Sequence, residues 1–584
     1  MKIQHSFLNE KKEYQWQMKQ VVYTACFVFM CFIDQIRNNS LLIPQLSFAN
    51  MTGICIGLII LIHFPLREFF GIPYAIWTIL FTAGVLGMRG SAETVYQYHM
   101  WQWYTGAANV WLYGMIAVRL LLGVLTAGER PKRNRFFLAV WLLMMVGMIL
   151  SKSDSVWPLW FLVMFGCFYF TEFSKTEVRL LLKGALNGII IAFFLLQGFG
   201  SMFRAYEIET RYTGIYSNSN MNALFYLVAG TAILAKLYWI YAERASLPKK
   251  IFWIAMCGLV SAFLLLPIGR TSLMLMGIEI LLLNLMILRR QVHRAFLRFF
   301  LRLAAVGVSV ILFFPAAFYL ARWIQPEYGT SMIYSDDDYR EERVRAKTPE
   351  EEQKYIELDV FAQEAFGRFL DILDSGYQER MRQGRRLLPM RKVYAAGEEN
   401  AALSVQTAEA EEESKAEALQ PASGEEPMFP TVQLMPPEEE GFVYGSGSSP
   451  EDPVFMNMEG AFRIRWGVYR LYLSRLNFAG HKTNENGLWL MSNFYASHAH
   501  DLFLQMFFNF GYITGALFAV YAASGLIVIL FRSLRKRGDS RINVTTMLFL
   551  LLFVGFGLFE IDWRVGHLPF TMYFMMQYFL LRKA

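Results

Sequence analysis

The sequence predicts an all-α polytopic integral membrane protein with about 14 transmembrane helices (range 12–14) and one large extracytoplasmic loop. Composition is the first reason, because 55% of the 584 residues are apolar and the mean hydropathy is +0.31, which excludes an ordinary soluble protein. The second reason is the recurrence of apolar runs long enough to cross a bilayer, which takes about 17–25 residues. Because backbone groups in lipid must bond within their own segment, each run is expected to be a helix.

The predicted spans form two groups, one on either side of a long hydrophilic loop. Residues 1–324 hold about 11 helices and residues 499–584 about three. The run 501–531 is long enough to contain a re-entrant piece. No small-residue cleavage site follows the first run, so a cleavable signal peptide is not expected. The spans are predicted at 19–34, 48–64, 72–88, 107–125, 135–151, 155–171, 178–200, 220–242, 250–268, 270–288, 300–324, 501–531, 543–559 and 566–581.

Basic residues predict the orientation of these helices. If the lysine-rich amino terminus is cytoplasmic, strict alternation puts every strongly basic short loop on the cytoplasmic face, as the positive-inside rule requires. Both termini are then cytoplasmic and residues 325–498 lie outside. The net charge of +7 reflects these loops, so no nucleic-acid partner is expected. The basic residues concerned are Lys2, Lys11, Lys12, Lys19, Arg130, Lys132, Arg133, Arg135, Lys249, Lys250, Arg289, Arg290, Arg294, Arg298, Arg532, Arg535, Lys536, Arg537, Arg541, Arg582 and Lys583.

The extracytoplasmic loop, residues 325–498, is not uniform. Residues 341–390 carry an apolar stripe at helical spacing, which predicts packing. Residues 398–440 are rich in glutamate and proline and poor in large apolar side chains, and a Gly/Ser/Pro stretch follows to position 453. Such a chain buries too little apolar surface to offset its conformational entropy, so the segment 398–453 is predicted to be disordered.

Two histidines and an aspartate stand where this loop re-enters the membrane, in S-H-A-H-D at 497–501. Histidine titrates near neutral pH and suits proton transfer at a membrane surface. One interpretation makes His498, His500 and Asp501 a polar patch that anchors a helix end, and the other makes them a catalytic group. The two histidines could bind a metal, but no third ligand stands at a metal-site spacing, so no metal or other cofactor is expected.

A run of arginines precedes the histidines. The segment R-I-R-W-G-V-Y-R-L-Y-L-S-R, residues 463–475, is predicted to be a helix with Trp466 on one side. Arg463 and Arg465 belong to a set of arginines that gives this helix positive charge outside the cell. They bind either lipid headgroups and the nearby acidic segment or an anionic ligand, since the forked guanidinium donors match phosphate.

Two further outer segments fit an anion site. The loop Glu209–Asn220 places Arg211 and several amides at the outer surface. The link Pro267–Arg270 leaves Arg270 at a helix start, where the helix dipole does not favour a cation. Arg270 therefore either snorkels to the headgroups or, with the helix-terminal amides, binds a phosphate.

These segments resemble motifs of the O-antigen ligase and polymerase superfamily of polytopic glycan transferases. The family pattern is His, then Asn, Ser or Gln, nine residues, Gly, two residues, then Gly, Thr or Tyr. Here His500 is followed by Asp501, nine residues, Gly511, two residues and Thr514. Asp501 stands where the family has an uncharged residue.

Three other segments extend the resemblance over roughly residues 200–515. R-I-R-W at 463–466, with L-N-F-A-G-H at 476–481, is similar to the family's Arg–x–x–Trp helix and the turn after it. R-Y-T-G-I-Y-S-N-S-N at 211–220 is similar to its Arg–x–x–Gly segment with a following Asn. G-R-T-S at 269–272 is similar to its Ser-Arg helix start, with Gly in place of Ser. The outer loop is longer than is usual for the family, chiefly through the acidic insertion.

The resemblance implies a metal-independent membrane glycosyltransferase of the bacterial cytoplasmic membrane. It would move a glycan from an undecaprenyl-diphosphate carrier to an acceptor hydroxyl at the outer face. Its partners would be the lipid-linked donor, membrane lipids, and an acceptor that is a glycolipid, a wall polymer or a glycan. The catalytic residues would be His500 as general base, with Arg270 and Arg463. The substrate-binding residues would be Arg211, Arg465, Asn220, Trp466, His498 and Asp501.

Other functions stay open at this point. A polysaccharide polymerase of the same superfamily has the same motifs, although one dominant loop before the His motif favours a ligase. A transporter or flippase of lipid-linked glycans would account for Glu279, a carboxylate midway along the span 270–288, since intramembrane ionisable residues mark ion or substrate pathways. Glu279 could equally pair with a polar neighbour such as Asn284. A receptor would rest on the large loop alone.

Overall fold

The computed structural model describes the membrane helices and most of their connections. Contacts divide the chain into two compact units, residues 1–361 with 465–584, and residues 362–464. The predicted disordered segment 398–453 lies outside the described residues, as does most of the predicted helical segment 341–390. The described residues are 2–39, 45–87, 89–128, 132–155, 157–203, 211–214, 216, 219–289, 295–322, 358, 361–362, 365, 460–482, 485, 487–491, 494–496, 498–535, 538–560 and 567–582.

Helices dominate the described residues, and every predicted span overlaps one of them. Several begin with the residues that the rules of helix capping favour: Asn134, Asp501 and Asp539 each accept a hydrogen bond from a backbone N–H of the first turn. The helices are α1 (Lys2–Asn39), α2 (Gln45–Leu61), α3 (Ile72–Gly87), α4 (Arg89–Ala127), α5 (Arg135–Leu150), α6 (Trp157–Phe170), α7 (Lys175–Phe203), α8 (Ser219–Ala242), α9 (Leu247–Leu265), α10 (Arg270–Leu288), α11 (Ala295–Arg322), α17 (Gly460–Ser474), α18 (Leu502–Leu534), α19 (Ser540–Gly557) and α20 (Leu568–Leu581).

Nine helices within the described residues are long and apolar enough to cross a membrane. Shorter apolar stretches occur in α2, α3, α5, α6 and α20. The chain is therefore a helical, multi-pass membrane protein, as predicted, while a total of about 14 spans stays a prediction. The all-α class holds, with one short hairpin added to it. Strand β1 (Leu488–Met491) pairs antiparallel with β2 (Phe494–Ala496) in the segment that leads to the His motif.

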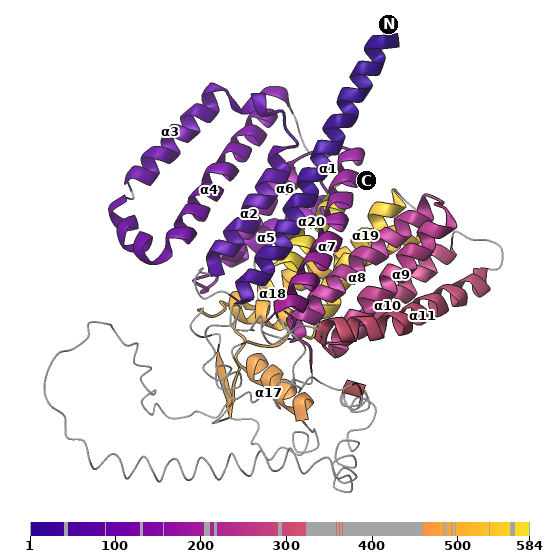
Figure 1. Cartoon of the computed structure of the whole chain (residues 1–584). Helices are drawn as coiled ribbons and strands as arrows, with labels where there is room; N and C mark the ends of the chain where they lie inside the picture. The colour runs from indigo at the N-terminus through magenta and orange to yellow at the C-terminus, as the bar shows by residue number, and fades with distance from the viewer. Residues whose placement is uncertain are drawn as a thin grey trace, which may run out of the picture. The chain divides into compact units, whose positions relative to one another are not determined.

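Helix α8 is the most deeply buried of the nine long membrane helices. It packs against α7, α9, α10 and α19 (Figure 1), and most of its side chains are buried. Small residues permit α8 and α10 to pack closely. A Cβ atom on Gly230 of α8 would lie 2.8 Å from Sδ of Met276 in α10. One on Gly269, directly before α10, would lie 2.7 Å from Cβ of Ala223 in α8. Close approach through glycine and alanine is a common way for helices to associate in lipid.

The basic loops predicted to be cytoplasmic meet at one end of the helices. Arg289 at the end of α10 donates to the carbonyl of Leu534 at the end of α18. Arg532 of α18 donates to Phe579 near the end of α20, and Arg582 pairs by backbone bonds with Arg133 before α5. We call this end of the first unit, defined by these contacts, the basic end. The opposite end carries the starts of α8, α10 and α18 and the end of α19.

Helix α18 is broken near its start. Gly511 has φ 81° and ψ 171°, so a short helical piece that begins at Leu502 ends there and a longer one follows. The break accounts for the unusual length of the predicted run 501–531. Only glycine adopts this backbone conformation readily.

Candidate functional site

Glu560, just after α19, joins residues from three distant parts of the chain. Its Oε1 atom lies 2.6 Å from Nη2 of Arg465 in α17 and accepts a hydrogen bond of 3.2 Å from Nδ2 of Asn220 in α8. Its Oε2 atom lies 3.9 Å from Nδ1 of His500. The Glu560 side chain is 8% exposed, whereas Arg465 and His500 are 33% and 29% exposed. We call these residues, together with Arg211, the Glu560 cluster. A buried carboxylate with two accessible partners leaves the cluster open on one side.

Arg211 enters the cluster through Asn220. Its Nη2 atom donates to Asn220 Oδ1 at 2.5 Å, and its Nε atom donates to the carbonyl of Pro267 at 2.8 Å. The backbone N–H of Tyr212 donates to Leu266 at 3.1 Å, so the 211–216 segment is attached to the turn before α10. The two outer loops that the sequence predicted to share one site therefore do lie together.

His500 is held in a backbone conformation that few residues adopt. Its φ is 52°, in the left-handed region that disfavours a side chain with a Cβ atom. The Tyr469 hydroxyl donates to the His500 carbonyl at 3.2 Å, and the Gln505 side chain accepts from the Ala499 N–H at 2.8 Å. These bonds from α17 and α18 fix the turn. Such strain is typical of functional sites, where the surroundings impose the conformation.

The ring of His500 has one nitrogen that faces the carboxylate. Within the described residues, Nδ1 of His500 is buried and has no hydrogen-bond partner, and Glu560 Oε2 is the carboxylate atom near it. Burial of Glu560 opposes its ionisation, but His500 and Arg465 outweigh burial and hold the pKa of Glu560 below its ordinary value. The carboxylate is therefore ionised at neutral pH and can stabilise a positive charge on His500.

Asp501 takes a structural position beside the cluster. Its Oδ1 atom accepts from the N–H of Leu504 at 2.8 Å, and the residue caps α18. Burial raises the pKa of Asp501 to about 6, against the backbone N–H groups of Leu504 and Phe503, which favour the carboxylate. The capping role explains a polar side chain at this position, and an asparagine would fulfil it equally well.

The other predicted site residues are placed less closely. The ring of His498 lies against that of His500, with centroids 4.3 Å apart. Trp466 is 39% exposed. Arg270 is the first residue of α10, three positions after the carbonyl that Arg211 binds. The side chain of Arg463 lies outside the described residues, so its catalytic role stays a prediction; Arg465 is the arginine of this helix that contacts Glu560.

The turn L-N-F-A-G-H, residues 476–481, packs into the break in α18. Tyr512 N–H donates to the Asn477 carbonyl, and His481 N–H donates to the Asn509 carbonyl, each at 3.2 Å. The contact needs two glycines: a Cβ atom on Gly480 would lie 2.3 Å from the Asn509 carbonyl oxygen, and one on Gly511 would lie 2.0 Å from that of Phe478. The glycine of the His motif thus has a packing role, which is to position the first part of α18, directly after the turn that holds His500.

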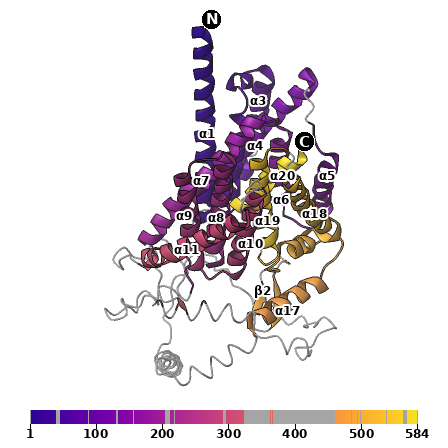
Figure 2. The ribbon, with the colours of Figure 1, turned by 90° about the vertical axis from the view of Figure 1, so that its right-hand side faces the viewer.

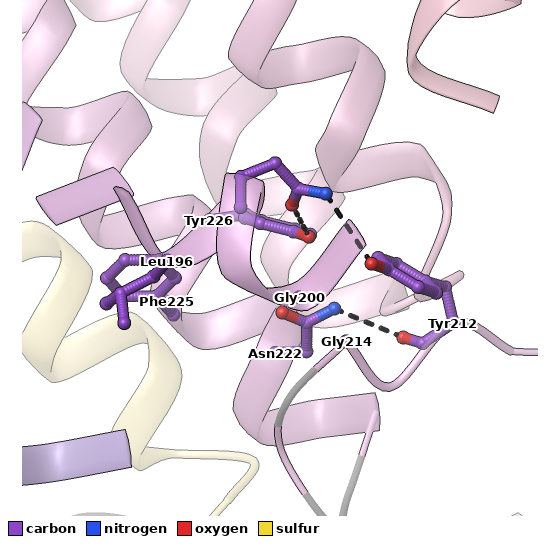
Figure 3. A pocket seen from close by; sticks show the side chains of 8 residues that line it. Leu196, Gly200, Tyr212, Gly214, Asn222, Phe225 and Tyr226 are labelled. Carbon is purple, nitrogen blue, oxygen red and sulfur yellow. Dashed lines mark hydrogen bonds between the residues drawn. The ribbon is translucent and has the colours of Figure 1, made fainter. Parts of the chain in front are cut away.

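Below the 211–216 segment, a small polar hollow lies between α7 and α8. Gln197 accepts from the Tyr226 hydroxyl and donates to the Tyr212 hydroxyl at 3.5 Å, and Asn222 donates to the Tyr212 carbonyl at 3.3 Å (Figure 3). Gly214, with φ 58°, completes the lining. These bonds occupy the polar groups that line the hollow, which therefore supports the loop that carries Arg211.

Sequence reasoning missed Glu560 and Tyr469. Glu560 follows an apolar run and precedes I-D-W, so it resembles an interfacial residue. A signal was nevertheless present, because strict alternation puts the end of span 543–559 on the same face as Arg211 and Arg465. A carboxylate near arginines on that face is a natural ion-pair partner.

Helix α17 and strand β2 lie side by side and support the His500 turn (Figure 2). Val468 and Tyr472 of α17 pack with Leu488 and Ala499 in a buried apolar cluster.

Within the described residues, no group of three or more His, Cys, Asp or Glu side chains is arranged to hold a metal ion. No family model, curated protein or solved structure matches this chain.

Proposed function

We propose that the chain is a glycosyltransferase that moves a glycan from an undecaprenyl-diphosphate carrier to an acceptor hydroxyl, as O-antigen ligases do. The observation that carries this proposal is the Glu560 cluster, in which an unpartnered ring nitrogen of His500 faces a buried carboxylate beside two arginines. A base and anion-binding cations at one open site are what transfer from a diphosphate carrier requires.

His500 is the general base of the proposed reaction. With Nδ1 toward Glu560, Nε2 is the nitrogen left to take the proton of the acceptor hydroxyl. The oxygen then attacks the anomeric carbon, and the bond from that carbon to the diphosphate breaks. The imidazolium that forms is stabilised by Glu560, as an aspartate stabilises histidine in hydrolase triads. A separation of 3.9 Å in the ligand-free site fits this role, because catalytic hydrogen bonds commonly shorten when substrate binds.

The arginines bind the leaving group. Undecaprenyl diphosphate gains negative charge as the glycosidic bond breaks, and Arg211 and Arg465 provide fixed guanidinium donors for it. Arg463, two residues before Arg465, and Arg270, three residues after the Pro267 carbonyl that Arg211 binds, are proposed to complete the set. The finer assignment to a ligase, with a glycolipid, wall polymer or glycan as acceptor, rests on the single long loop before the His motif.

The orientation supports a reaction at the outer face of the bacterial cytoplasmic membrane. The Glu560 cluster and the basic end lie at opposite ends of the helices, and basic loops are retained in the cytoplasm. Lipid-linked glycans would then reach the cluster from the outer leaflet.

A transfer assay in vesicles tests the proposal. Purified wild-type protein, supplied with a lipid-linked oligosaccharide and candidate acceptors, is expected to form product, whereas His500→Ala lowers the rate by roughly 10²–10⁴-fold, the usual contribution of a general base. His498→Ala, on the adjacent ring, is the matched control and is expected to retain more activity. Equal losses in both variants would show that the base is misassigned. Movement of the intact lipid-linked glycan between leaflets, with no new glycosidic bond, would identify a transporter instead.

A further inference from the structure

Glu279, midway along α10, is a fully buried acid away from the Glu560 cluster. Its side chain is 0% exposed, and its Oε2 atom lies 2.7 Å from the Thr231 hydroxyl of α8. The suggested partner Asn284 is engaged elsewhere, since its Oδ1 accepts from Arg302 and its Nδ2 donates to Ile280. Glu279 therefore connects the two helices that begin with Ser219 and Arg270.

Proton counting assigns the protonation state of this pair. A threonine hydroxyl has one proton, and the Thr231 oxygen lies within hydrogen-bond distance of both the Leu227 carbonyl, at 2.9 Å, and Glu279 Oε2. A carbonyl oxygen only accepts, whereas a carboxyl group can donate, so both contacts are hydrogen bonds only when the threonine proton goes to Leu227. The second bond then needs its proton from the carboxyl group. An ionised Glu279 would leave two lone pairs facing each other in one of the two contacts.

Burial leads to the same assignment. The Oε1 atom of Glu279 is buried and has no hydrogen-bond partner within the described residues. An ionised carboxylate in that position would be an uncompensated charge inside the membrane domain, which costs far more than a neutral acid with a free carbonyl oxygen.

The helices around Glu279 direct their charged groups elsewhere. Lys236 of α8 donates to Asn187 of α7 at 2.8 Å, and Arg302 of α11 donates to Asn284 at 2.8 Å. Helix α9 carries the buried thiol of Cys257, and α19 presents Gly555 to Leu275 of α10.

We propose that Glu279 is a proton-binding site whose bound proton holds α8 against α10. The ligand is a proton rather than a metal cation, since a proton on Glu279 lets both contacts of the Thr231 oxygen be hydrogen bonds. The site is independent of the proposed transferase reaction, but it fixes the two helices whose outer ends carry Asn220 and Arg270. Loss of the proton would place a charge in the contact and separate these helices.

Infrared difference spectroscopy on the protein in lipid vesicles tests the proposal. Subtraction of Glu279→Gln from wild type at pH 7 is expected to leave a carbonyl band of a protonated carboxylic acid that shifts in D₂O. Glutamine keeps a neutral N–H donor for Thr231, so this variant should fold. A carboxylate band in place of the acid band at pH 7 would overturn the proposal, as would an acid band that appears only when sodium is removed.

Variants of Thr231 test the direction of the hydrogen bond. Thr231→Val removes the acceptor, so the carbonyl band of Glu279 should move to higher frequency, whereas Thr231→Ser keeps the hydroxyl and the band. An unchanged band in Thr231→Val would refute the bond from the acid to Thr231. If Glu279→Gln does not fold, subtraction of the Thr231→Val spectrum shows the same acid as a shifted pair of bands.

Discussion

His500 Nδ1 lies 3.9 Å from Glu560 Oε2, because the start of α18 and the end of α19 lie at the same end of this helix pair. The carboxylate is buried and the ring is partly exposed, so the pair resembles a catalytic base whose ring is oriented by a buried carboxylate. Arg465 and Asn220 bind the other carboxylate oxygen, which fixes its position.

Glu560→Gln is expected to lower the transfer rate by roughly 10²–10⁴-fold, because the amide does not stabilise the imidazolium that His500 forms. Glu485→Gln, at an exposed position between α17 and β1, is the control and should have no effect. Rate constants in the vesicle assay decide the matter, and full activity in Glu560→Gln would remove Glu560 from the mechanism. Glu560 also contributes to the stability of the fold. Because its pKa in the folded state lies below its ordinary value of 4.5, the ionised carboxylate stabilises the folded state at pH values above 4.5. This stability is lost as the pH falls through the lowered pKa of Glu560.

Arg465→Lys is expected to impair use of the lipid-linked donor even though the charge stays. Lysine lacks the forked donors that bind a carboxylate and a phosphate together, and loss of a charge-assisted bond costs roughly 1.5–3 kcal/mol, or about 10–150-fold in kcat/KM. Arg475→Lys, at an exposed position after the same helix, should be neutral. Equal kcat/KM values for both variants and wild type would show that Arg465 serves structure alone.

Asp501→Asn is expected to stabilise the protein at neutral pH. Burial raises the pKa of Asp501 from 3.8 to about 6, so the folded state loses stability as pH rises through that window, when the buried carboxyl must ionise. Asparagine keeps the cap without this cost. Melting temperatures in detergent should differ at pH 7 and converge below about pH 4. A variant that is less stable at pH 7 would show that the negative charge itself is needed.

Gly511→Ala is expected to destabilise the protein at the break in α18. The backbone conformation is one that only glycine adopts easily, and the new methyl group would lie 2.0 Å from the Phe478 carbonyl oxygen. Strain of this kind costs about 1–3 kcal/mol before the steric clash is added. Gly277→Ala in α10, where a Cβ atom meets nothing within 4 Å, is the matched control and should be neutral or slightly stabilising. Melting temperatures and transfer rates of both variants test this account, and equal values for the two variants would contradict it.

Cysteine labelling tests the orientation. A membrane-impermeant maleimide should label Lys482→Cys in intact cells and Arg535→Cys only after permeabilisation, since both side chains are exposed and belong to opposite ends of α18. Four of the five native cysteines are buried and Cys167 is partly buried, which limits background labelling. The reverse labelling pattern would show that the predicted membrane orientation is inverted and that the Glu560 cluster lies on the cytoplasmic side.

The sequence by itself determined the membrane helices and the identity of most residues around the candidate site. Apolar runs of bilayer length are a local property, and every predicted span overlaps an observed helix. Arg211, Asn220, Arg465 and His500 were also predicted, because uncommon polar residues at one membrane face are visible in the chain itself.

Only the tertiary structure decided what these residues contact. Glu560 follows an apolar run like any interfacial acid, and its role arises from α19 ending beside α8 and α17. The same holds for Asp501, which proved to cap α18, and for Glu279, whose partner is Thr231 on another helix rather than Asn284 on its own. Hydropathy and motif spacing describe residues along one segment, whereas hydrogen bonds, burial and protonation depend on which segments pack together.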